Sequence, residues 1–177
     1  LGFAISAEKA RSLAAQRAAE AEATVNFLDD MLAAANPEQS KGNGVTVLSM
    51  LEASAASLDA LEHQPSVLIR ASRTLSRTYL ALARFDQALE MNARALSTLR
   101  TIPEPPAGLE AEILREQAAM QLEAGNSEKA SQSLELAERL LRHGTTAEER
   151  EVSLRLHFSR ARLYEETGNP ERSMDEL

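Results

Sequence analysis

The stretch of sequence that decides the fold covers residues 75–95 and reads LSRTYLALARFDQALEMNARA. It is rich in strong helix formers, and small residues stand on both sides of a tight turn expected at Ala83. Ser76 precedes this turn by 7 residues, while Ala88 and Ala95 follow it by 5 and 12 residues. Small side chains at fixed positions let two antiparallel helices approach each other closely. The stretch therefore predicts a pair of packed helices joined at Ala83.

The same arrangement recurs twice downstream. Gly125 and Gly168 take the place of Ala83, at intervals of 42 and 43 residues. Each turn is again flanked by small residues and preceded, 4 residues earlier, by a larger one. The small residues are Ala118, Ala130, Ala137, Ala161 and Ser173, and the larger ones are Tyr79, Gln121 and Tyr164. A fixed period of this length predicts an array of helical repeats.

This pattern resembles the tetratricopeptide repeat, in a lengthened form with about 42 residues in place of about 34. The resemblance implies an all-α fold, a right-handed α-solenoid of helix pairs with a concave groove. Some features depart from the family pattern. Ala83 replaces the usual turn glycine, Arg160 stands where a leucine is expected, and no repeat carries the early tryptophan.

Glycine, proline and capping residues set the bounds of the predicted domains. Repeats are predicted at 66–100, 109–142 and 147–177, the last one truncated, with a proline-rich connection after the first. Apolar residues at helical spacing predict docking helices over 25–65, ahead of the repeats. Residues 7–23 contain alanine and charge with Leu13 as their only large apolar residue, so a connector or juxtamembrane helix is expected over 1–24. Both ends are expected to be cuts from a larger protein.

The composition excludes several classes of protein. Aromatic residues make up only 3% of the 177 residues and tryptophan is absent, which argues against a β-sandwich or β-barrel. The formal net charge of −8 argues against nucleic-acid binding, because phosphate contacts need a basic surface. The absence of cysteine excludes disulfides, thiolate catalysis and cysteine-ligated zinc.

Short motifs upstream of the first repeat and within it match a known family. They are Phe27-Leu28, Met31-Leu32, Ala35-Asn36-Pro37, Gly44-Val45-Thr46-Val47, Met50-Leu51, Gln64-Pro65, Tyr79, Phe85 and Ala88. In these motifs the region from Val25 to Leu96 resembles the part that follows the kinase domain in bacterial serine/threonine protein kinases with C-terminal tetratricopeptide repeats. That family commonly places a helix rich in alanine and charge between a membrane helix and this block. The resemblance therefore implies a parent protein anchored in the membrane just before Leu1.

Catalytic and metal-binding patterns are missing from the sequence. The kinase motifs are absent, namely the glycine-rich loop, the catalytic-loop aspartate and asparagine, and the magnesium-binding Asp-Phe-Gly. His63, His143 and His157 do not share a helical face with a carboxylate at ligand spacing, and no serine or threonine has a partner base. The fragment is therefore predicted not to be an enzyme, with no cofactor and no metal.

Arginines gather at the positions that the repeat register assigns to the inner face of each first helix. Arg70, Arg73 and Arg77 are spaced 3 and 4 residues apart and share one stripe of their helix. The same register adds Arg115 in the second repeat, and Arg155 and Arg162 in the third. One interpretation is a ligand-binding groove for an acidic peptide or a C-terminal carboxylate, since guanidinium binds carboxylate bidentately. The other is that each arginine pairs with a glutamate of a neighbouring repeat and ties the repeats together.

These observations predict a non-catalytic protein-interaction or sensor domain of a bacterial serine/threonine kinase, with a protein or peptide ligand in the concave groove. If the kinase domain precedes the membrane helix in the cytoplasm, this domain lies in the periplasm, as the resemblance implies. One alternative is the repeat region of a cytoplasmic transcriptional regulator. Another is a self-assembling scaffold or homodimer, in which a second copy fills the groove.

Overall fold

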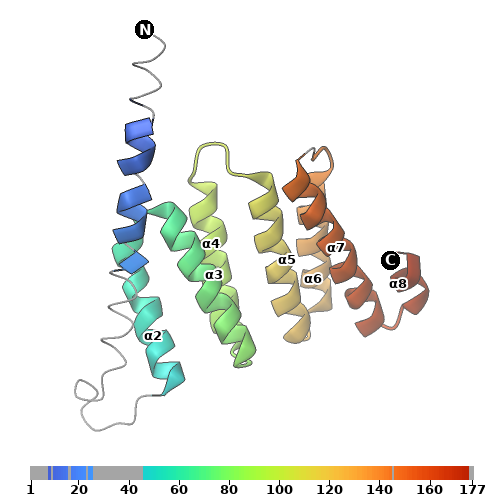
Figure 1. Cartoon of the computed structure of the whole chain (residues 1–177). Helices are drawn as coiled ribbons and strands as arrows, with labels where there is room; N and C mark the ends of the chain where they lie inside the picture. The colour runs from blue at the N-terminus through green and yellow to red at the C-terminus, as the bar shows by residue number, and fades with distance from the viewer. Residues whose placement is uncertain are drawn as a thin grey trace. The chain divides into compact units, whose positions relative to one another are not determined.

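A computed structural model describes residues 8, 10–15, 17–22, 24–25, 46–144 and 146–175 (Figure 1). The regular secondary structure of these residues is helical throughout, which confirms the all-α prediction for the described part of the chain. The chain divides into two compact units, residues 1–71 and 72–177, with the boundary inside helix α3.

The first unit contains helix α2 (Val47–Ser57), the 3-10 turn η1 (Leu58–Leu61) and the first residues of helix α3 (Pro65–Ala81). Thr46 caps α2, since its hydroxyl accepts a hydrogen bond from the backbone N–H of Ser49 at 3.1 Å. The Ser49 hydroxyl in turn accepts one from the N–H of Thr46 at 3.0 Å. Such reciprocal bonds satisfy N–H groups that the start of a helix leaves without partners.

Upstream of α2, the described residues between 8 and 25 are helical, and Leu13 among them is exposed. Residues 1–7 and 26–45 lie outside the described residues. The predicted docking helices at 25–65 are therefore described only at residue 25 and from residue 46 onward, and three of the nine motifs that carry the kinase resemblance fall wholly in the gap. Among the described helices, none has both the length and the apolar character that crossing a membrane requires.

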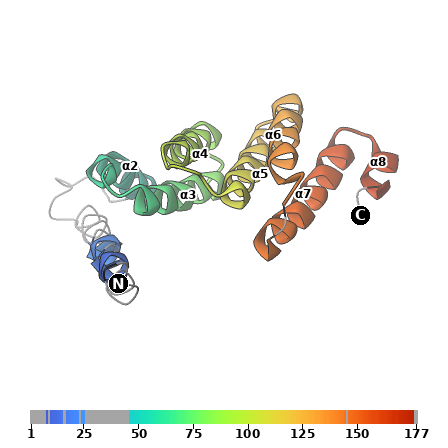
Figure 2. The ribbon, with the colours of Figure 1, turned by 90° about the horizontal axis from the view of Figure 1, so that it is seen from above.

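The second unit begins within α3 and continues through five further helices. They are α4 (Phe85–Arg100), α5 (Ala107–Glu123), α6 (Ser127–Leu141), α7 (Ala147–Glu166) and α8 (Pro170–Asp175). Figure 2 shows α5 and α7 on one side of this row of helices, with α4 and α6 on the other. Helix α5 starts 2 residues earlier than the predicted bound of 109, because the extended backbone of Pro106 already serves as its N-cap.

The three predicted turns share one hydrogen-bonding pattern. Ala83, Gly125 and Gly168 have positive φ angles of 53°, 77° and 76°. The N–H after each turn residue donates to the carbonyl 5 residues earlier, at Tyr79, Gln121 and Tyr164, over 2.9, 2.7 and 2.8 Å. This is the Schellman ending of a helix, which requires a left-handed residue at the turn. The turn positions inferred from the sequence are therefore confirmed.

Ala83 carries a side chain in a backbone conformation that favours glycine, because its Cβ crowds the following carbonyl. We expect Ala83→Gly to raise the free energy of unfolding by about 0.5–1 kcal/mol, since the relief of left-handed strain exceeds the entropy that the unfolded chain gains. Ala93→Gly, an exposed position inside α4, should lower it by about 0.5–1 kcal/mol. Urea unfolding of both variants tests this, and equal losses would contradict it.

Small residues at the predicted positions are buried between the helices. Ala88, Ala95, Ala130 and Ala137 are buried in α4 and α6, and the Ser76 hydroxyl donates to the Ala88 carbonyl at 2.7 Å. Gln121, which replaces the tyrosine found at the equivalent place in the other pairs, accepts a hydrogen bond from the Ser133 hydroxyl at 2.8 Å. The polar substitution is therefore satisfied inside the core, as buried amides require.

Candidate functional site

Five of the six arginines predicted for the groove lie in the second unit, and each of the five forms an ion pair with a glutamate. Arg73 and Arg77 are on α3, Arg115 is on α5, and Arg155 and Arg162 are on α7. Arg70 is exposed in the part of α3 that belongs to the first unit.

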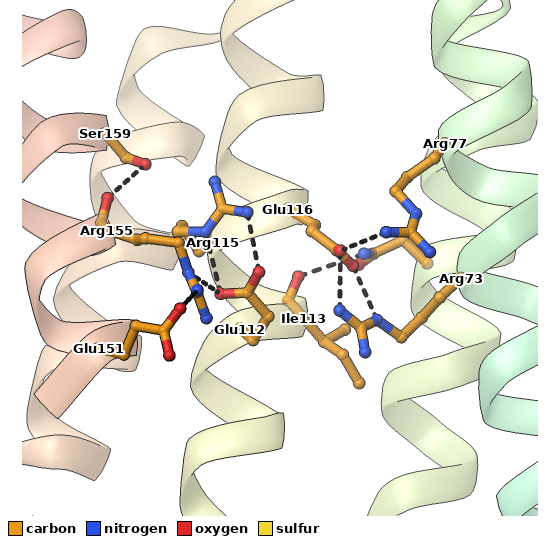
Figure 3. A network of polar contacts seen from close by, with 10 residues as sticks. Arg73, Arg77, Glu112, Ile113, Arg115, Glu116, Glu151, Arg155 and Ser159 are labelled. Atoms are coloured by element: carbon orange, nitrogen blue, oxygen red, sulfur yellow. Dashed lines mark hydrogen bonds and ion pairs between the residues drawn. The ribbon is translucent and has the colours of Figure 1, made fainter. Parts of the chain in front are cut away.

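Glu116 joins helices α3 and α5 where they lie against each other, a contact that we call the α3–α5 seam. Arg73 binds its carboxylate with two parallel hydrogen bonds, from Nε to Oε2 at 3.0 Å and from Nη2 to Oε1 at 2.8 Å. Arg77 approaches the same carboxylate at 4.0 Å (Figure 3). The Glu116 side chain is only 7% exposed, and its hydrogen bond to Arg73 raises the pKa of that guanidinium in spite of burial. This is a desolvated, two-bond ion pair.

The seam between α5 and α7 uses a different glutamate. Arg115 binds Glu112 of its own helix, from Nε to Oε2 at 3.1 Å and from Nη2 to Oε1 at 2.9 Å. Arg155 of α7 places Nε 3.4 Å from the same carboxylate and Nη1 2.6 Å from Glu151 (Figure 3). Glu112 thus links α5 to α7. Burial alone would raise the pKa of Glu112, but the two arginines lower it below its ordinary value.

A cavity of about 290 Å³ lies between α5, α6 and α7. Arg115, Arg155 and Arg162 border it, and so does Phe158, a large apolar side chain that is 56% exposed. Its other lining residues are small or apolar: Ala118, Ala119, Leu122, Ala130, Leu134, Ser159 and Leu163. The cavity therefore combines an apolar interior with a border of guanidinium groups.

The repeat register compares this cavity with the position of the Arg73–Glu116 pair in the α3–α5 seam. Ser159 stands 43 residues after Glu116 and takes its place in the register. Its hydroxyl donates back to the Arg155 carbonyl at 3.0 Å and does not reach toward α5 (Figure 3). Arg115, the equivalent of Arg73, turns to Glu112 of its own helix. A short side chain at position 159 thus leaves unfilled the space that Glu116 fills in the other seam.

Two further ion pairs join α7 to the preceding helices. Arg162 pairs with Glu123 of α5, and also with Glu166 of its own helix at 2.8 Å. Arg160, which occupies a register position where leucine is expected, places Nη2 2.7 Å from Oε1 of Glu138 on α6. The leucine-to-arginine departure seen in the sequence is thus matched by an acidic partner on the neighbouring helix.

Glu112 and Glu116 were not identified from the sequence, which indicated glutamate partners for the arginines without naming them. Their spacing of 4 residues, on the same stripe of α5 as Arg115, is the signal that could have identified them. Phe158 was also missed, although the register places it where Arg73 and Arg115 stand in the earlier pairs. In the described part of the chain, no group of histidines or carboxylates is arranged to hold a metal ion.

The lowered pKa of Glu112 predicts a pH-dependent contribution to stability. The folded protein holds this carboxyl deprotonated at a lower pH than the unfolded chain does, so its stabilising effect is complete above the unfolded pKa. That effect is lost as pH falls through the folded value. The stability difference between the wild type and Glu112→Gln should therefore be largest near about pH 6 and shrink toward about pH 3. Thermal unfolding across this range measures it, and a difference that grows on acidification would contradict the assignment.

Comparison of the chain with family models, curated proteins and solved structures finds no match.

Proposed function

We propose that this chain is a non-catalytic protein-interaction or sensor domain of a bacterial serine/threonine protein kinase. Its helix pairs form a right-handed solenoid of the tetratricopeptide type, and a protein or peptide binds in the concave groove formed by the first helix of each pair. The resemblance of Val25 to Leu96 to such kinases supports this parent protein, and we propose that the domain lies on the periplasmic side of the inner membrane, as it would if the kinase domain precedes the membrane helix in the cytoplasm.

The observation that carries the binding role is the cavity between α5, α6 and α7, which three of the predicted arginines border. Repeat proteins of this kind use the extended surface of stacked helices to bind their ligands. A cavity with an apolar interior and hydrogen-bond donors at its edge suits a peptide, whose side chains and carbonyl groups offer both kinds of contact.

The ion pairs favour a second role for some of the same arginines. Arg73 is bound to Glu116 across the α3–α5 seam, as expected if the arginines tie neighbouring repeats together. Arg155 and Arg162 also reach glutamates of α5. We propose that these pairs fix the spacing of the helix pairs and so shape the groove, while the cavity supplies the contact with the ligand.

Panning a randomised peptide library against the purified chain tests the binding role. We expect a family of related peptides to be enriched, and fluorescence anisotropy with a labelled member should give saturable 1:1 binding. A library that yields no saturable binder would overturn the proposed function.

Light scattering over a range of concentrations distinguishes a monomeric domain from the self-assembling scaffold, because the measured mass of a self-assembling chain would rise with concentration. A kinase domain and an apolar segment of about 20 residues encoded upstream of Leu1 would favour the kinase over the transcriptional regulator.

A further inference from the structure

We propose that the α5–α7 cavity is the receptor for a single apolar side chain of the ligand, of leucine or methionine size, and that charge at its border contributes little to affinity. This inference rests on the proposed peptide-binding function and specifies which part of the peptide is recognised. It follows from the size of the cavity, its lining and the charge balance around it.

The size of the cavity selects a side chain over a small-molecule cofactor. Sites for drug-sized ligands usually enclose about 300–1,000 Å³. The α5–α7 cavity, at about 290 Å³, lies just below that range and opens at the surface beside Phe158. It has room for one aliphatic side chain together with part of the peptide backbone that carries it.

Seven of the eleven side chains that line the cavity are apolar. Alanine and leucine side chains from three helices line it, and the aromatic ring of Phe158 stands at its edge. Removing an aliphatic side chain from water into such surroundings is favourable in proportion to the area buried. For a leucine-sized group this amounts to roughly 10- to 100-fold in affinity.

The border of the cavity has no surplus of positive charge for an acidic ligand. Its three arginines are matched by four carboxylates, which belong to Glu112, Glu123, Glu151 and Glu166. An acidic residue of the ligand would have to displace one of these glutamates from its arginine. The energy gained from the new ion pair would then be offset by the loss of the existing one. A neutral apolar side chain meets no such competition.

The repeat register supplies variants that close the cavity. Ser159→Glu gives position 159 the glutamate that its register equivalent, position 116, has in the α3–α5 seam. The new carboxylate should bind Arg115 as Glu116 binds Arg73. Ala119→Leu fills the same space with an aliphatic group. Ser97→Glu, on the exposed surface of α4, is the matched control, because it makes the same chemical change away from the cavity.

The test is a nuclear magnetic resonance titration of protein labelled at its alanine methyl groups. The neutral probe N-acetyl-leucinamide should shift the methyl signals of Ala118, Ala119 and Ala130 in the wild type. The same shifts should appear in Ser97→Glu, while Ser159→Glu should bind at least about 10-fold more weakly. N-acetyl-aspartate should not compete, and raising salt from about 0.05 to about 0.5 M should change the probe's affinity less than about 2-fold.

Several results would overturn the proposal. They are the absence of shifts at the cavity alanines in the wild type, undiminished binding by Ser159→Glu, or tighter, salt-sensitive binding of N-acetyl-aspartate. Should Ser159→Glu fail to fold by circular dichroism, Ala119→Leu and the wild-type shifts decide the matter. Failure of the proposed function looks different: N-acetyl-leucinamide occupies the cavity, yet no library peptide binds. Conversely, library peptides whose affinity Ser159→Glu leaves unchanged would support the function and refute this receptor.

Discussion

Arg73→Gln should lower the free energy of unfolding by about 2–4 kcal/mol. The substitution leaves the Glu116 carboxylate almost enclosed and without its two-bond partner. Removing one member of a buried ion pair commonly costs about 3–5 kcal/mol, and the partial exposure of Arg73 reduces that figure. Urea unfolding, followed by far-ultraviolet circular dichroism, measures the change.

Two controls separate the ion pair from a general effect of losing charge. Arg77→Gln removes a guanidinium that is 59% exposed and 4.0 Å from the same carboxylate, so its cost should stay below about 1 kcal/mol. The double variant Arg73→Gln with Glu116→Gln should recover much of the loss, because no buried charge is then left alone. If Arg73→Gln and Arg77→Gln cost the same, the assignment of Glu116 as the tie between α3 and α5 is wrong.

This result also bears on the two interpretations of the arginine stripe. A groove that binds an acidic peptide through Arg70, Arg73 and Arg77 predicts that replacing all three with glutamine abolishes binding and leaves the melting temperature nearly unchanged. Inter-repeat ties predict a lower melting temperature with little change in peptide affinity. The bidentate contact of Arg73 with Glu116 favours the second outcome.

The features that could be predicted from the sequence are those that depend on local chemistry. The turn at Gly125 follows from its neighbours, because a glycine after a helical run provides the left-handed residue of a Schellman motif. The capping box of Thr146 and Glu149 follows from spacing alone, and both of its reciprocal bonds are present. Buried alanines such as Ala88 and Ala130 follow from the period.

The contacts that could not be predicted join residues far apart in the chain. Arg73 and Glu116 are separated by 43 residues, and the sequence offers two other glutamates on the same helix face. Which carboxylate an arginine selects depends on side-chain length and on what else fills the seam. Ser159 illustrates this dependence, because its short side chain borders a cavity that no local pattern indicates.

The converse substitution, Glu116→Ser, should open in the α3–α5 seam the kind of cavity that Ser159 leaves beside α7. We expect it to lower the free energy of unfolding by about 2–4 kcal/mol, because the Arg73 guanidinium loses its partner and the space of the carboxylate is left empty. The new cavity would adjoin Met120, which is buried next to Ser76. The methyl signal of Met120 should therefore respond to N-acetyl-leucinamide in this variant and not in the wild type.

Combining Glu116→Ser with Ser159→Glu should move the apolar site from one seam to the other. In the double variant N-acetyl-leucinamide should shift the methyl signal of Met120 and leave those of Ala118 and Ala130 unchanged, since each seam then has the residue that the other had. A Glu116→Ser variant that loses less than about 0.5 kcal/mol and takes up no probe would mean that the seam closes without its carboxylate. In that case the length of the side chain at positions 116 and 159 does not determine which seam has a cavity for an apolar side chain.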